Sequence, residues 1–195
     1  FSLAKRIKNF NIQLESLVHY PSQMKLKIRQ EQPSDYAQTK KVVQLAFDKK
    51  AEWTLVEKLR KNPNFIPELS IVAEIDKKIV WHILIFPVSV VDGNHIHEIL
   101  SLSPVSVHPN FQDNWIWTKL VEEALKKSKK YWTWMLVLWH KDYYPRFWFK
   151  PARNRNINPP FDIPDEVFLA IELKKNWLKK ISWVVHYPHE FTELE

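Results

Sequence analysis

The chain has 195 residues, of which 45% are hydrophobic and 14% aromatic, and its formal net charge at pH 7 is +7. This length and apolar content favour a single folded domain and exclude an intrinsically disordered chain. The chain contains no cysteine, which excludes disulfides and cysteine nucleophiles and fits a cytoplasmic protein. No apolar run approaches the roughly 20 residues of a membrane-spanning helix, so we expect no membrane partner.

The positive charge raises the question of a nucleic-acid partner. However, the lysines are scattered over expected helix faces, as at Lys126, Lys127, Lys129 and Lys130. Such a pattern is typical of a solvated surface. We therefore expect no nucleic-acid partner, and note that a moderately basic surface also suits an anionic cofactor.

The expected elements follow one another from residue 24, and residues 1–23 read as an N-terminal extension whose native status is open. Alternating or continuous apolar residues predict strands, and helical spacing with Pro, Ser or Asn boundaries predicts helices. Pro104 interrupts one strand, which indicates a bulge or a splayed edge. The expected strands are 24–30, 69–76, 78–91, 97–109, 135–140, 167–173 and 182–188. The expected helices are 32–47, 52–62 and 115–130, with a short helix and a turn over 143–152. This order predicts one α/β or α+β domain over residues 24–195.

Glycine is anomalously rare. Average usage predicts about 14 glycines in a chain of this length, yet there is one, Gly93, beside ten tryptophans. Tight turns and close backbone approaches normally require glycine. The composition therefore suggests that tryptophans stand where glycines belong.

The stretch after the strand ending near Val107 has the layout of an anion-binding site. A polar turn leads into the expected helix 115–130, and the free N–H groups of a first helical turn attract phosphate. Side chains over those N–H groups must be small if a diphosphate is to reach them. Trp115 and Trp117 occupy these positions instead.

Three segments in order resemble the GNAT superfamily of acyl-CoA-dependent N-acyltransferases. The first, "VSVHPNFQDNWIWTKLVEEAL", resembles its pyrophosphate loop, Gln/Arg-x-x-Gly-x-Gly/Ala, but has Trp115 and Trp117 at the glycines. The second, "YYPRFWFKPA", resembles its Tyr-x-x-x-Gly-Phe segment with Trp148 at the glycine, and the third, "DKKIVWHILI", resembles a mid-sheet hairpin with Trp81 there. The late strands resemble a bacterial subgroup of predicted N-acetyltransferases. The resemblance implies a mixed twisted sheet with helices on both faces.

All three matches fail in the same way, since tryptophan stands at each glycine position. Independent decay would give scattered replacements, so one uniform substitution favours a decoding cause. We hypothesise that the gene uses UGA for glycine and that UGA has here been read as tryptophan. The positions that fit best are Trp81, Trp115, Trp117, Trp139, Trp148 and Trp183. The alternative is a genuinely tryptophan-rich variant whose cofactor site is blocked.

The resemblance also implies acetyl-CoA as co-substrate. Backbone groups of the strand would pair with the pantetheine arm, and the turn and first helical turn would hold the pyrophosphate. The residues concerned are Val105, Ser106, Val107, Gln112, Asp113, Asn114, Trp115, Ile116, Trp117 and Thr118.

By the same resemblance, Tyr144 is the expected acid for the departing thiolate, with half-buried helix packing as the alternative. The amine must lose a proton, and Glu98 is our first choice of base, ahead of His97 and His82. A metal site at His95, His97 and Glu98 fits no firm ligand spacing, and we expect none.

The expected activity is acetyl transfer to a primary amine of a small molecule or protein, by a monomer or homodimer. The amine would bind between the first two helices and the segment 153–165. A non-catalytic relative that binds acyl-CoA or a partner remains the alternative function.

Overall fold

The computed structural model describes residues 25–47, 50–112, 114–138, 140–174 and 182–192. The expectations for residues 1–23, for Asp113 and for Trp139 lie outside these ranges. None of the helices within them has the length and apolar character that crossing a bilayer requires.

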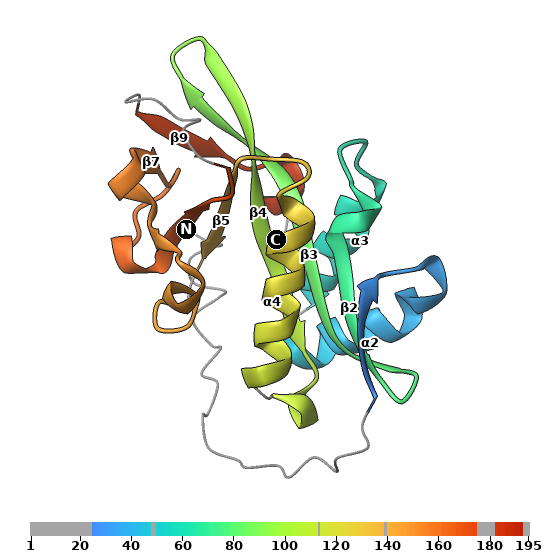
Figure 1. Ribbon diagram of the computed structural model, residues 1–195. Coiled ribbons are helices and arrows are strands. Elements are labelled where there is room, and N and C mark those ends of the chain that lie inside the picture. The colour runs from blue at the N-terminus through green and yellow to red at the C-terminus, as the bar shows by residue number, and fades with distance from the viewer. Residues whose placement is uncertain (1–24, 48–49, 113, 139, 175–181, 193–195) are drawn as a thin grey trace.

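The described residues form a nine-stranded mixed sheet with the order β1-β2-β3-β4-β5-β8-β6, and β9 lies beside β3 and β7 (Figure 1). β4 and β5 are parallel and are joined through a helix, as parallel neighbours require. Each strand that the sequence predicts is present. The strands are β1 Leu26–Gln30, β2 Ser70–Ile75, β3 Lys78–Asp92, β4 His95–Val107, β5 Trp134–Leu138, β6 Lys150–Pro151, β7 Ile157–Asn158, β8 Phe168–Glu172 and β9 Trp183–His186.

Helices cover both faces of the sheet, as expected (Figure 1). The α-helices are α2 Tyr36–Ala46, α3 Lys50–Lys61 and α4 Asn114–Ser128. Successive side chains of β3 alternate between the two faces. Leu84 and Phe86 pack with α2 and α3, whereas Ile83 and Ile85 pack with α4.

Seven short 3-10 turns connect the described elements. They are η1 Pro33–Asp35, η2 Pro67–Leu69, η3 Pro109–Phe111, η4 Tyr144–Phe147, η5 Ala152–Arg155, η6 Asp165–Val167 and η7 His189–Phe191. The short helix and turn expected over 143–152 are present as η4 and the residues after it, which include the short strand β6. η4 ends at Trp148, whose φ of 71° cannot continue a right-handed helix.

β4 leaves its neighbour β5 part way along its length. Leu102, opposite Val137, is the last β4 residue that pairs with β5. The next two residues, Ser103–Pro104, are joined by a cis peptide, and the register with β3 shifts there. Residues 105–107 pair with β3 alone among the described strands. The bulge expected at Pro104 is confirmed, and beyond it the edge of β4 no longer pairs with β5. We call the region between these two strand ends the slot.

A buried polar network fastens α3 to the sheet on the face opposite α4. Arg60 of α3 lies 2.5 Å from the carboxylate of Glu31, which also accepts a 2.7 Å hydrogen bond from the Ser70 hydroxyl. His82 Nε2 lies 3.1 Å from the same hydroxyl, and its side chain is fully buried. Burial opposes ionisation of Glu31, but the facing imidazole and guanidinium and the Ser70 hydrogen bond together lower its pKa.

The buried histidine predicts that acid destabilises the fold. Burial lowers the pKa of His82 from 6.5 to about 4. Between these two pH values the imidazole is protonated in the unfolded chain but neutral in the native state. The stability from this group is complete above its unfolded pKa and is lost as pH falls toward 4. Between pH 7 and pH 5 we expect a loss of about 2 kcal/mol from His82. Urea unfolding of the protein and of His82→Gln at both pH values measures it. Equal pH slopes in the two proteins would contradict the assignment.

Candidate active site

The slot between β4 and β5 opens directly in front of the first turn of α4. Val105 and Val107 lie on the strand edge that faces the slot, where their backbone groups have no strand partner among the described residues. The chain then turns through η3, and α4 begins at Asn114. A free strand edge and a helix N-terminus therefore lie close together, and both offer N–H groups to an elongated anionic ligand.

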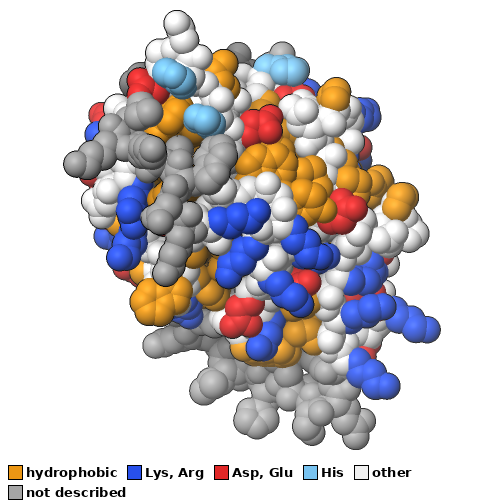
Figure 2. Space-filling view, turned by 45° about the horizontal axis from the view of Figure 1, so that its top comes forward, with side chains coloured by type: hydrophobic (Ala, Val, Ile, Leu, Met, Phe, Trp, Pro, Cys, Tyr) orange, Lys and Arg blue, Asp and Glu red, His pale blue; other side chains and the backbone are white. Residues whose placement is uncertain are grey.

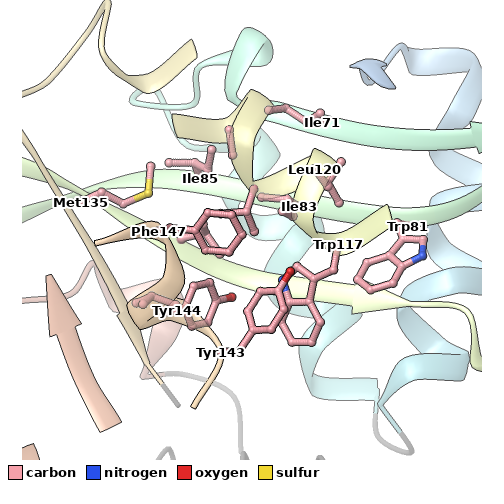
Figure 3. Packing of buried hydrophobic residues seen from close by; sticks show 14 of the residues in the cluster. Ile71, Trp81, Ile83, Ile85, Trp117, Leu120, Met135, Tyr143, Tyr144 and Phe147 are labelled. Atoms are coloured by element: carbon pink, nitrogen blue, oxygen red, sulfur yellow. The ribbon is translucent and has the colours of Figure 1, made fainter. Parts of the chain in front are cut away.

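An aromatic cluster surrounds Trp117 at the start of α4 (Figure 3). Trp117, in the first turn of α4, is 2% exposed. Its indole stacks on Tyr143 with 4.2 Å between ring centroids, and meets His140 edge-on at 5.0 Å and Trp81 at 5.7 Å. The indole thus occupies space that a ligand between the strands would need. As the chain stands, the backbone donors suit a diphosphate but the side chain at position 117 does not.

Tyr144 lies against this cluster and is 1% exposed. Its ring centroid lies 6.1 Å from that of Trp117, and its hydroxyl points toward the indole (Figure 3). Burial raises the pKa of the Tyr144 phenol well above its ordinary value. The phenol therefore keeps its proton at neutral pH, and its burial makes it a weaker acid than an exposed tyrosine.

The three candidate bases lie in different environments. Glu98 is exposed on β4, opposite Ser89 of β3. His97 packs edge-on against Trp183 at 4.9 Å. His82 lies in the buried network beneath α2 and α3, away from the slot. Within the described ranges no three His, Asp or Glu side chains converge as metal ligands.

The remaining predicted cofactor residues lie around the start of α4. Ser106 is buried on β4, and its hydroxyl meets no hydrogen-bond partner among the described residues. Gln112 is exposed where η3 ends, and Ile116 is fully buried in the core. The Thr118 hydroxyl lies 3.2 Å from that of Tyr143. Trp115 is 44% exposed on the first turn of α4.

Several tryptophans lie in positions that suit an indole poorly. Trp148 has a φ of 71° and is 79% exposed, and a bulky residue seldom adopts this conformation. The buried indoles of Trp53, Trp134 and Trp183 have N–H groups without an acceptor among the described residues, which native proteins rarely leave. Trp81 differs, because its indole donates a 2.9 Å hydrogen bond to the carbonyl of Phe111.

Sequence reasoning missed two members of the slot, His140 and Tyr143. Burial lowers the pKa of His140 to about 4, and this residue has a φ of 53°. Both contact Trp117 from the far side of the slot. The adjacent tyrosines of "YYPRF" were the one available signal for Tyr143, and the family motif drew attention to Tyr144 alone.

Comparison with known families identifies this arrangement. A family model described as "Acetyltransferase (GNAT) domain" matches residues 27–152, which include the slot, α4 and η4. The chain belongs to the GNAT family of acetyltransferases. It is 29% identical over 136 residues to the uncharacterised N-acetyltransferase YjhQ of Escherichia coli (strain K12), a match that covers 68% of this chain and 75% of the relative.

Two solved structures share the fold. The GNAT family N-acetyltransferase YhbS from Escherichia coli, determined in complex with CoA, superimposes with a TM-score of 0.78 at 20% identity, covering 91% of this chain and 97% of that protein. A GNAT family acetyltransferase from Brucella melitensis, determined in complex with acetyl-CoA, gives a TM-score of 0.68 at 27% identity, covering 86% and 98%. The predicted mixed sheet with helices on both faces is confirmed.

Proposed function

We propose that the natural form of this protein carries glycine at positions 115, 117 and 148 and is an acetyl-CoA-dependent N-acetyltransferase. Its acceptor would be a primary amine of a small molecule or protein. One observation carries the proposal: the free edge of β4 beyond Leu102 leads directly to the N-terminus of α4. Membership of the GNAT family and the relatives bound to CoA and acetyl-CoA support it.

In this proposal the backbone holds the acetyl donor. Val105 and Val107 would pair with the pantetheine arm, on the strand edge that β5 leaves uncovered. The N–H groups from about Asn114 to Thr118 would bind the pyrophosphate, whose charge the helix N-terminus favours. Both interactions require that no ring lies over the amides, so they depend on glycine at positions 115 and 117.

The side chains would supply proton transfer. A neutral amine attacks the thioester carbonyl, so a C–N bond forms and the C–S bond breaks. Tyr144 would protonate the departing thiolate, because its hydroxyl points toward the indole that glycine would replace. Glu98, through water, would accept the proton that the amine releases. The tyrosinate then regains a proton from solvent.

A second candidate function follows from the chain as it stands. Trp117 packs against four other rings, so a protein with genuine tryptophans would have a closed slot. Such a protein would bind a partner, or acyl-CoA at another surface, without turnover.

The activity is tested with the triple variant Trp115→Gly/Trp117→Gly/Trp148→Gly, acetyl-CoA and a panel of amines. A thiol reagent detects the CoA that each transfer releases. Because the chain has no cysteine, the reagent reports CoA alone. We expect amine-dependent release from the glycine variant. Adding Tyr144→Phe should lower kcat by about 100-fold, the usual scale for losing a general acid, with little change in KM.

The Phe substitution keeps the ring that packs in the core, so a purely structural Tyr144 would leave kcat unchanged. That result would remove the assigned role while leaving the transferase proposal intact. If the glycine variant folds and binds acetyl-CoA but acetylates no amine, the non-catalytic function is the correct one.

A further inference from the structure

A second hollow lies at the other end of α4 from the slot. It has a volume of about 430 Å³, which is within the usual range for small-molecule sites. α4 rises about 1.5 Å per residue, so the hollow lies roughly 20 Å from the first turn of α4. Its main lining residues are Leu125, Lys129, Phe147, Lys150, Arg155 and Leu173.

The charge of this pocket is mainly positive. Lys129 follows α4, Lys150 lies on β6 and Arg155 ends η5, so three separate elements bring cations to one cavity. None of the three makes an ion pair with another residue in the described ranges. The lining contains a single carboxylate, Glu172. Figure 2 shows lysine and arginine side chains spread over one face of the molecule.

The pocket also has an apolar floor. Phe147 and Leu173 are each 8% exposed, and Leu125 packs partly buried beside them. The Arg155 guanidinium lies 5.9 Å from the centre of the Trp134 ring, which holds it over an aromatic surface. An inorganic anion would satisfy the cations but leave this floor uncovered.

We propose that this pocket binds a small organic anion, with a flat apolar body of one or two rings that carries a carboxylate or a phosphate. The rings would lie on Phe147 and Leu173, and the anionic group would meet Lys129, Lys150 and Arg155. Trp134 and Trp148 also line the pocket, so the proposal concerns the chain with tryptophan at both positions. It is also independent of acetyl transfer.

The test is calorimetric titration of the protein with naphthoate, naphthyl phosphate, neutral naphthamide and inorganic phosphate. We expect both naphthyl anions to bind, and both naphthamide and inorganic phosphate to bind at least about tenfold more weakly, because each lacks one of the two interactions. Lys150→Gln and Arg155→Gln should each weaken the naphthyl anions by about tenfold, the usual effect of losing one charged hydrogen bond.

Lys126→Gln is the matched control. Lys126 lies on α4, one turn before Lys129, but its side chain is 77% exposed and pairs with Glu123. Its replacement should therefore leave the binding of the naphthyl anions unchanged. Binding of inorganic phosphate as strong as that of the naphthyl anions would overturn the proposal. So would the absence of anion binding, or equal effects of Lys126→Gln and Lys150→Gln.

Discussion

Replacing Trp115 and Trp117 by glycine is expected to raise the affinity for acetyl-CoA by about 100-fold. The change removes the two rings at the start of α4, one 44% exposed and the other 2% exposed within the slot. It makes the first-turn amides accessible to the pyrophosphate. Two charged hydrogen bonds of about 1.5 kcal/mol each correspond to this factor. Calorimetry with acetyl-CoA measures it directly.

Trp183→Gly is the control for lost packing. Trp183 is equally buried, at 2% exposed, but lies on β9 away from α4. Each buried substitution is expected to cost about 3–5 kcal/mol of unfolding free energy, yet only the slot variant should gain affinity. If glycine at position 117 prevents folding, Trp117→Ala provides the same test, since alanine is small and favours helix. Folded slot variants that bind acetyl-CoA no better than the original chain would refute the blocked-slot explanation.

Arg60→Met is expected to lower the free energy of unfolding by about 3–5 kcal/mol, because it leaves the Glu31 carboxylate buried without its cation. The two side chains are 7% and 1% exposed. In a chain of this size the loss corresponds to a fall in Tm of about 10 °C. Methionine keeps the aliphatic stem of Arg60 against Tyr36, over whose ring the guanidinium lies at 4.0 Å. Thermal and urea unfolding report the change.

Two further variants distinguish the effect of the unpaired buried charge from the effect of lost packing. Arg153→Met removes an exposed pair with Asp165, whose side chains are 44% and 55% exposed, and should cost less than about 1 kcal/mol. The double variant Glu31→Met/Arg60→Met should recover much of the stability, since neither charge is then left alone in the core. An Arg60→Met protein as stable as Arg153→Met would show that the network contributes little.

The sequence predicted the strands well because their apolar patterns are long enough to read. The alternation from residue 26 gave β1, and the apolar run of β5 predicted a strand covered on both faces. β6 and β7 have two residues each, too few for any periodicity. The short helix and turn expected over 143–152 are confirmed, but the sequence did not place the end of the helix, because the left-handed backbone of Trp148 cannot be read from an indole.

The candidate site was predictable only in outline. Pro104 gave the bulge, because proline disrupts a strand ladder in a way that sequence reveals. The stack of Trp117 on Tyr143 joins α4 to the segment after β5, and such contacts between distant elements leave no local pattern. His82 was a candidate base. Strand alternation puts it on the same face of β3 as Leu84 and Phe86, which lies under α2 and α3 and away from the slot.

Pro104 has a lasting effect on how the slot behaves. A proline nitrogen carries no hydrogen, and the bulge turns β4 out of register just where β5 ends its pairing. Beyond Leu102, β4 and β5 therefore do not form backbone pairs even when no ligand is bound. In the glycine form, acetyl-CoA would therefore meet a strand edge that β5 already leaves free, without the affinity penalty of first populating a rare open form.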